Sequence, residues 1–356
     1  MMWKGWRKGV ASASVMLLLC GCGMPGTEQT TVPSATPYPT GVSSEKLSQM
    51  TREERFAQTV MRVGGLEVSY GEVVLYMQST KEEVETLYGN EVWNYALDKD
   101  GTTYAKKLKD ELLEQIIYTK VVCAQAERLG ISLSEDELLD VDEYTAVYLD
   151  NFTQSELDYY GITKAQVEAI YRDNLLATKI YESLTLNVDT DVTDEEARQA
   201  VLYSMFLAKY RIEEDGTRTT LREEELQLLR ERAEQLAAEA EQTEDFYTFA
   251  KEHTESTESV EMTVGRGELH EPLEKVAFAL QEGELGGLVE TEEGYFLLYC
   301  KTYQEEDATE QKKIDIILER QEKAFSENYA IWEAETEVWV DRLLWDSIDL
   351  TGEKCE

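Results

Sequence analysis

Few side chains in this sequence have the types and spacing that catalysis requires. The chain holds only two histidines and five cysteines. Cys123, Cys300 and Cys355 stand far apart without CxxC spacing, so the cysteines predict neither a disulfide framework nor a zinc site. The sequence also lacks a Walker phosphate loop, a GxSxG nucleophile turn and an HExxH motif. We therefore predict no metal site and no cofactor.

The first 21 residues instead have the pattern of a secretory signal peptide. Three cations fall within the first eight residues, and residues 15–19 form an apolar stretch before small residues and a cysteine. This stretch is too short to span a bilayer comfortably, which makes a permanent membrane helix the weaker alternative.

Lipid chemistry is indicated for the cysteine that follows. LCGC, residues 19–22, resembles the lipobox of bacterial lipoproteins, which implies cleavage before Cys22 and acylation of its thiol. Acyl chains partition into lipid at about 0.8 kcal/mol per buried methylene, so a multiply acylated Cys22 would hold the protein at the membrane. Residues 22–50 are rich in Thr, Pro and Ser and are predicted to be a tether. The expected location is extracytoplasmic, with a membrane anchor.

The chain is strongly acidic, with 73 Asp and Glu against 34 Lys and Arg and a net charge of −39. Such a field disfavours nucleic acid and anionic lipid surfaces as partners. It favours cationic segments or divalent ions, although its commonest meaning is solubility.

Helices dominate the region that follows the tether, residues 51–192. MRVGGLEVSY, residues 61–70, predicts a β-hairpin around Gly64 and Gly65 that leads into a helix. Capping boxes, in which Ser or Thr is followed three residues later by Glu or Gln, mark the helix starts. They are Thr51/Glu54, Ser69/Glu72, Ser134/Glu137, Thr163/Gln166 and Thr193/Glu196.

An apolar stripe runs along one of these helices. Val141, Tyr144, Tyr148 and Phe152 recur every three or four residues, as on one face of a helix. Such a stripe is usually part of a core, and a cradle for unfolded chains is the alternative reading.

The pattern changes to α+β over residues 193–305. LYSMFLAKYRI predicts a strand, two helices follow, and the segment ends in a pair of strands that includes GYFLLYC. Residues 306–350 are predicted to be helical again, with an apolar face that needs a partner.

The middle segment resembles the parvulin-type peptidyl-prolyl isomerase domain. The resemblance rests on RAEQLAAEAEQTEDFYTFAKEH, GRGEL and LEKVAFALQEGELGGLVETEEGYFLLY, in that order across residues 200–303. The flanking segments, with the lipobox, RVGGLEVSYGEV, AERLGISLSEDEL and a tryptophan-rich end, resemble PrsA-type foldase lipoproteins and SurA-like chaperones. This resemblance implies one helical chaperone domain built from residues 51–192 and 306–350, with the parvulin-like domain inserted. It also implies unfolded exported polypeptides as partners and allows a homodimer.

The chain departs from the parvulin pattern at the positions that usually carry polar chemistry. In that family a histidine stands in the first strand and another in the last, with an Asp or Cys between them. By register these positions hold Met205, Phe296 and, near the third, Val260. The resemblance therefore implies an apolar peptide groove without assigned catalytic residues. Its candidate residues are Met205, Leu207, Leu269, Leu273, Phe278 and Phe296.

The two histidines match none of these positions. His253 falls at a helix end, where a structural role is expected, and His270 in a loop is a candidate for the groove rim. A groove collapsed into core is the alternative to an open one.

Three functions remain open from the sequence. The leading prediction is a membrane-anchored chaperone for exported polypeptides whose parvulin-like domain is a weak or inactive isomerase. The second is an active isomerase that uses another polar partner, such as Ser204 or Tyr295. A solute-binding lipoprotein is the third, but the long helical stretches do not supply the two α/β lobes that it needs.

Overall fold

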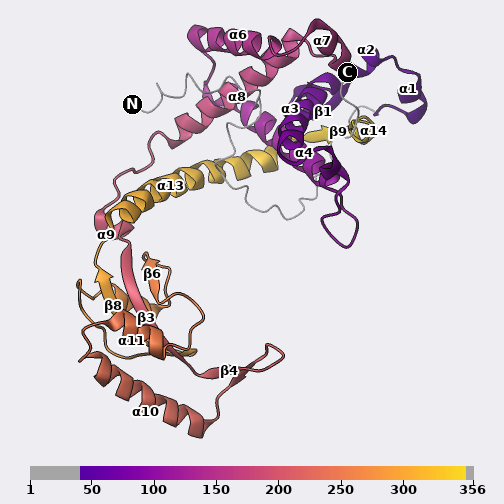
Figure 1. Cartoon of the computed structure of the whole chain (residues 1–356). Coiled ribbons are helices and arrows are strands. Elements are labelled where there is room, and N and C mark those ends of the chain that lie inside the picture. The colour runs from indigo at the N-terminus through magenta and orange to yellow at the C-terminus, as the bar shows by residue number, and fades with distance from the viewer. Residues whose placement is uncertain (1–40, 350–356) are drawn as a thin grey trace. The chain divides into compact units, whose positions relative to one another are not determined.

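Two compact units make up the part of the chain that the structure describes. The computed structural model describes residues 41–349, of which residues 41–187 and 322–349 form the first unit and Val188–Gln321 the second (Figure 1). The first unit is thus built from both ends of the chain, and the second is inserted between them. The predicted α+β class is confirmed. Cys22 and the predicted signal peptide lie outside the described residues.

The second unit includes more residues than the inserted segment predicted from sequence. It starts at Val188 and ends at Gln321, whereas the prediction was 193–305. The difference at the C-terminal side arises because the long helix α13 (Glu306–Glu335) begins in the second unit and ends in the first.

No helix within residues 41–349 is both long and apolar enough to cross a membrane.

The N-terminal part of the first unit is a β-hairpin among helices. The elements are α1 (Ser44–Gln49), α2 (Arg52–Phe56), β1 (Thr59–Val63), β2 (Leu66–Ser69), α3 (Tyr70–Tyr88), the 3-10 helix η3 (Asn90–Asn94), α4 (Tyr104–Cys123), α5 (Ala126–Leu129), α6 (Glu135–Leu149), α7 (Gln154–Tyr160) and α8 (Lys164–Thr185).

The predicted helix starts are confirmed by their caps. Thr51, Ser134 and Thr163 form reciprocal capping boxes with the residues three positions later. The side chains of Ser69 and Thr193 accept from the backbone N–H of the third following residue, so each satisfies one donor at the start of its helix.

The C-terminal segment is wrongly predicted as one continuous helix. Helix α13 ends at Glu335, and β9 (Val338–Val340) then pairs antiparallel with β1 as the third strand of the sheet β2-β1-β9 (Figure 1). The short helix α14 (Arg342–Asp346) follows. Val-Trp-Val has strand-forming side chains, and β9 covers the edge of β1 that would otherwise leave its backbone groups unpaired.

The C-terminal residues also complete the apolar cores of the first unit. Leu344, Trp345 and Ile348 lie in one core with residues of the hairpin and of α3 and α4. Phe325 and Trp332 of α13 lie in another with Val63 and residues of α4 and α8. The partner that the sequence required for the apolar face of the last helix is therefore the N-terminal helical region.

A buried cluster of charges lies between α3, α4 and α8. Lys120 donates to Glu72 at 2.8 Å and to Asp173, and both Lys120 and Glu72 are almost fully buried. Burial raises the pKa of Glu72, and the charge and hydrogen bond of Lys120 offset only part of this increase. Burial alone would lower the pKa of Lys120, but the charges of Glu72 and Asp173 outweigh it and raise that pKa. Cys123 lies beside them, and its thiol donates to the Asp173 carbonyl at 3.3 Å.

The predicted apolar stripe belongs mainly to the core, although Phe152 lies beyond the end of α6 at Leu149. Val141 and Tyr148 are buried, and Phe152 packs against the ring of Tyr148 at 5.2 Å between centroids. Tyr144 is the exposed member and lies 5.7 Å from the ring of Tyr171. The core reading of this stripe is therefore confirmed for three of the four residues.

The second unit is a four-stranded sheet with helices on both faces. The strand order is β6-β3-β8-β7, and a separate hairpin, β4-β5, extends from the end of β3. The elements are α9 (Asp194–Ala197), β3 (Ala200–Ala208), β4 (Tyr210–Ile212), β5 (Arg218–Thr220), α10 (Glu223–Ala240), α11 (Phe246–His253), β6 (Glu261–Val264), α12 (Glu271–Ala277), β7 (Val289–Glu290), β8 (Gly294–Thr302) and the first half of α13.

Candidate functional site

The two central strands of the second unit define its candidate site. β3 and β8 pair antiparallel, with Ser204 opposite Leu298 and Phe206 opposite Phe296 (Figure 1). Gly294 at the start of β8 has no room for a side chain, because a Cβ atom there would lie 2.1 Å from the Leu207 carbonyl oxygen. Since successive side chains point to opposite faces, these pairs assign every strand residue to one face of the sheet.

We name one side the Phe296 face, defined by Ser204, Phe206, Phe296 and Leu298. The rings of Phe206 and Phe296 pack with their centroids 4.5 Å apart. Leu273 and Ala277 of α12 are buried in the core on this face. Phe296, Leu269 and Phe278 remain partly exposed at its margin, so this face is neither an open groove nor fully closed core.

The six predicted groove residues do not share one surface. Leu269, Leu273, Phe278 and Phe296 lie in the core of the Phe296 face, but Met205 and Leu207 lie on the opposite side of the sheet. The prediction is thus shifted by one residue in β3, because Phe206, and not Met205, lies on the same face as Phe296. The sequence could not reveal the shift, since Met205 and Phe206 are both apolar and alternation alone does not say which one faces α12.

We name the other side the Met205 face. Met205 and Leu207 are fully buried there against helices α10 and α11. Val260, predicted near the position of an acid or thiol, is buried in the same core. These three residues contribute packing and have no access to a substrate.

The polar residues near the candidate site have little capacity for proton transfer. Ser204 is nearly buried on the Phe296 face. Cys300 is buried in the same core, and burial raises the pKa of its thiol. Tyr295 lies on the Met205 face, where its hydroxyl is 3.3 Å from a Glu290 oxygen and burial raises its pKa. Of the two polar partners considered from sequence, the structure therefore keeps only Ser204 on the same face as Phe296.

Comparisons with known families agree with this architecture. Residues 216–302 match the PPIC-type PPIase (peptidyl-prolyl isomerase) domain, and residues 47–156 match the SurA-like N-terminal domain. The chain combines a SurA-like domain with a PPIC-type domain. The resemblance inferred from the sequence is thereby confirmed, and the Phe296 face is a surface of the PPIC-type domain.

Two curated relatives share one name, and the similarity covers most of their length. A protein named foldase protein PrsA from Clostridium botulinum strain Langeland is 23% identical over 312 residues, which cover 82% of this chain and 90% of that protein. A foldase protein PrsA from Caldanaerobacter subterraneus is 24% identical over 255 residues, which cover 69% and 74%. Among solved structures, PrsA from Bacillus cereus is 15% identical with a TM-score of 0.34, over 83% of this chain and 93% of that one. A score this low supports no argument about this chain.

A buried arginine supports the margin of the Phe296 face in the PPIC-type domain. Arg198 is 1% exposed, and its guanidinium lies 4.0 Å from the centroid of the Tyr303 ring and 4.9 Å from that of Phe278. Its Nη2 donates to the Phe278 carbonyl at 2.8 Å. Cation–π contacts gain strength when they are desolvated, so Arg198 fixes the position of Phe278.

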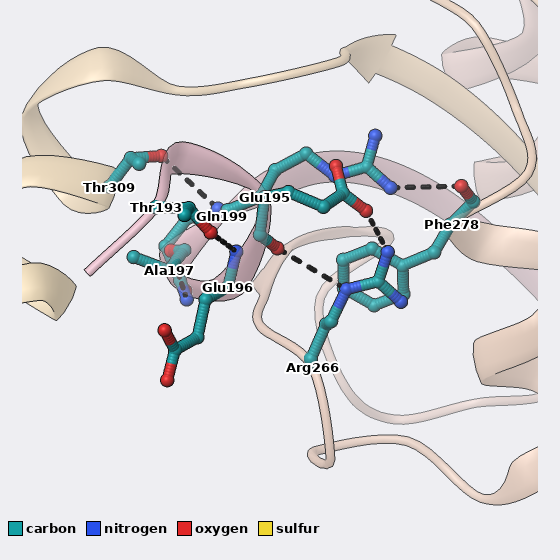
Figure 2. A network of polar contacts seen from close by, with 9 residues as sticks. Thr193, Glu195, Glu196, Ala197, Gln199, Arg266, Phe278 and Thr309 are labelled. Carbon is teal, nitrogen blue, oxygen red and sulfur yellow. Dashed lines mark hydrogen bonds and ion pairs between the residues drawn. The ribbon is translucent and has the colours of Figure 1, made fainter. Parts of the chain in front are cut away.

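This arginine belongs to a larger polar network around α9 (Figure 2). The guanidinium of Arg266 lies 4.6 Å from the centroid of the Phe278 ring and pairs with Glu195, which also approaches Arg198 Nε at 3.8 Å. Thr309 of α13 accepts from the backbone N–H of Gln199 at 3.2 Å. Sequence reasoning missed this network. Its local signal in the sequence is a charged residue, Arg198, two positions before a buried strand.

The two histidines lie at helix boundaries, with His253 at a helix end as expected. His253 ends α11 and contacts Phe249, with the ring planes tilted by 53° and the ring centroids 4.6 Å apart. His270 is the N-cap residue of α12, and its side chain makes no capping bond. Within residues 41–349, no group of three or more His, Cys, Asp or Glu side chains could hold a metal ion.

Proposed function

We propose that this protein is an extracytoplasmic foldase-type chaperone that binds exported, unfolded polypeptides, and that its PPIC-type domain is a weak or inactive isomerase. The relatives named foldase protein PrsA and the combination of SurA-like and PPIC-type domains support the chaperone part. The proposal of weak isomerase activity is our own and depends on the side chains of the Phe296 face.

One observation carries this proposal: the rings of Phe206 and Phe296 pack against each other on the Phe296 face. Neither ring can exchange a proton or make a strong hydrogen bond. Rotation about a peptide bond must cross a barrier of about 18–20 kcal/mol, and positioned polar groups are the usual means of stabilising a transition state. The apolar face can desolvate a twisted amide, which carries less charge separation than a planar one, but it offers no such stabilisation.

Binding of unfolded chains requires different properties, which the SurA-like part supplies. Leu87 and Tyr88 at the end of α3, and Tyr95 directly after η3, each expose about two thirds of their surface. Single exposed apolar residues are ordinary, but several large ones close in sequence indicate a surface for apolar partners. Such a surface would hold clients during X-Pro isomerisation, which takes tens to hundreds of seconds.

We expect the protein to suppress aggregation of an unfolded client at near-stoichiometric ratios, while it accelerates X-Pro isomerisation in a short peptide barely above background. Light scattering of a denatured client and a protease-coupled peptide assay measure the two activities. If the wild type catalyses a proline peptide as efficiently as an ordinary parvulin, and Phe296→Ala lowers that rate in a folded protein, the weak-isomerase proposal is wrong and an active isomerase replaces it.

A pair of double variants tests the role of the Phe296 face. Phe206→His with Phe296→His places two imidazoles on one face, across from each other, and is expected to raise the isomerisation rate. Met205→His with Phe296→His places them on opposite faces and serves as the matched control. Equal rates for the two double variants would show that the face does not control the activity.

We further propose that Cys22 carries the lipid anchor. The proposal rests on the LCGC sequence and the preceding signal-like segment, which lie outside the described residues. Cys22→Ala is expected to move the protein from the membrane fraction to the soluble or secreted fraction, because acylation supplies the membrane affinity. Detergent partitioning with mass analysis of the N-terminal peptide measures this. An unmodified Cys22 in the wild-type protein would rule out the anchor.

A further inference from the structure

A cleft of the second unit lies beside helix α10. This cleft of about 510 Å³ lies between the end of β3, the start of β4 and helix α10. Its volume is in the range of ordinary ligand sites. It is lined by Ala208, Tyr210, Arg211, Leu221, Glu225, Leu228, Leu229, Arg232 and Glu255.

The floor and one wall of this cleft are apolar. Ala208 and Leu229 are nearly buried, and Tyr210 and Leu221 are partly exposed. Leu228 is 65% exposed although it lines the cleft. A leucine that is left this open gains free energy when a partner covers it.

Both carboxylate oxygens of each glutamate in the cleft already accept a hydrogen bond. One oxygen of Glu255 accepts from Arg232 at 2.7 Å and the other from the backbone N–H of Ala208 at 2.9 Å. One oxygen of Glu225 accepts from the backbone N–H and the Nε of Arg222, and the other from Arg211 at 3.4 Å. The hydrogen bonds from Arg222 lower the pKa of Glu225 to about 2, so this carboxylate stays ionised.

The two arginines of the cleft, in contrast, keep unused donors. A guanidinium carries five N–H donors. The described contacts of Arg232 engage one of them, through Glu255, and those of Arg211 engage two, through Glu225 and Glu213. Both side chains are about half exposed. The cleft therefore has more unused donors than unused acceptors, which favours a partner whose polar part accepts hydrogen bonds.

From this arrangement we infer that the cleft binds a segment of unfolded polypeptide in which a large apolar side chain lies next to a carboxylate. The apolar side chain covers Leu228 and Leu229, and the carboxylate receives bonds from Arg211 and Arg232. Charge-assisted bonds from arginine to carboxylate are the stronger kind, and a guanidinium can present two parallel donors. The carboxylate is either the C-terminus of the chain or an Asp or Glu side chain, which have the same chemistry.

Glu255 acts as a positioning residue for this cleft. Its backbone N–H donates to the Phe206 carbonyl at 2.7 Å, and its side chain joins Ala208 of β3 to Arg232 of α10. These bonds fix Arg232 relative to strand β3, so its side chain loses little conformational entropy when a partner binds.

This inference rests on the proposed binding of unfolded chains and names the class of segment that the PPIC-type domain selects. The test uses the full chain and fluorescein-labelled peptides of glycine and serine that end in leucine and phenylalanine. One peptide has a free C-terminal carboxylate, the second is amidated, and the third is amidated after an added aspartate. Fluorescence anisotropy gives the three affinities.

We expect both carboxylate peptides, or one of them, to bind about fivefold or more tightly than the amidated peptide. Arg232→Gln should remove that preference. Leu228→Ser should weaken all three peptides by about tenfold, since it removes most of an apolar side chain from the contact. Leu228 is exposed, so this second variant is expected to fold even if Arg232→Gln disturbs Glu255.

Arg230→Gln is the matched control, because Arg230 lies on the same helix and pairs with Glu234 but does not line the cleft. Equal binding of the three peptides to the wild type overturns the inference, as does an equal loss of preference in Arg230→Gln and Arg232→Gln. An aggregation assay on the same samples separates the two proposals. Suppression without carboxylate preference overturns this inference alone, whereas absence of suppression overturns the proposed function.

Discussion

Deletion of residues 322–356 is expected to unfold the first unit while the second unit stays folded. The deletion removes β9 from the sheet and takes Phe325, Trp332, Leu344 and Trp345 out of two cores. Truncation of one buried aromatic typically costs about 3–5 kcal/mol, so the combined loss exceeds the usual total stability of about 5–15 kcal/mol. The second unit, Val188–Gln321, keeps all of its own residues.

Limited proteolysis with mass analysis distinguishes the outcomes of this deletion. Cleavage is expected throughout residues 59–187, with a resistant fragment near residues 188–321. Two neighbours on α13 provide a milder, matched comparison: Trp332→Ala removes a side chain that is 2% exposed, and Ile331→Ala one that is 55% exposed. Resistance of residues 59–187 in the truncated chain, or equal effects of the two point variants, would contradict the role assigned to the C-terminal segment.

Lys120→Met is expected to lower the free energy of unfolding of the first unit by about 3–5 kcal/mol. The substitution leaves Glu72 and Asp173 close together without their cation, and Glu72 is almost fully buried. Lys107→Met is the control, because Lys107 forms an exposed pair with Glu111 that is worth about 0–1 kcal/mol. Urea unfolding followed by circular dichroism measures both variants.

A compensating variant tests the physical reason for that loss. Lys120→Met combined with Glu72→Gln and Asp173→Asn removes the uncompensated charges together with the lysine, and should recover much of the stability. No recovery, together with an equal loss in Lys107→Met, would show that buried charge is not the cause.

The same cluster should make the first unit less stable as pH rises. The raised pKa of Lys120 means that its contribution is complete below the unfolded-state pKa of about 10.4 and is lost as pH rises through the folded-state pKa. Burial also raises the pKa of Cys123, so the unfolded thiol ionises first, above a pH of about 8.5, and stability falls by up to about 1.4 kcal/mol per pH unit. Urea unfolding between pH 8 and 10 should show the decline that Cys123 causes, and Cys123→Ala should reduce it, because the Lys120 contribution is lost only above this range.

Local signals in the sequence determined the ends and types of many elements. The five Ser and Thr caps each start a helix, since a side-chain oxygen can satisfy a backbone donor only at a helix start. Gly64 and Gly65 make the predicted hairpin turn, where both residues have positive φ, a conformation that glycine adopts at low cost. The motifs of the middle segment were sufficient to predict the PPIC-type domain, and the flanking motifs were sufficient to predict the SurA-like domain.

Only the tertiary structure decided which strand residues meet at the candidate site. The resemblance placed Met205 and Phe296 in one groove, but the strand pairing sets Phe206 opposite Phe296 and buries Met205 on the other face. A shift of one residue exchanges the two faces of a strand, and a strand that is apolar on both faces carries no alternation to fix the choice. The cross-strand register fixes it, because the two strands are joined by hydrogen bonds along nearly their full length.

The tertiary structure also decided every feature that joins distant segments. Strand β9 forms because the edge of β1 accepts it, although its three residues alone are too short to predict a strand. Arg198 contacts residues 80 and 105 positions away, and the cleft between β3 and α10 brings Glu255 to Arg232. Local sequence determines which conformations a segment prefers at low energy, whereas buried charges and strand edges obtain partners only when the chain has folded.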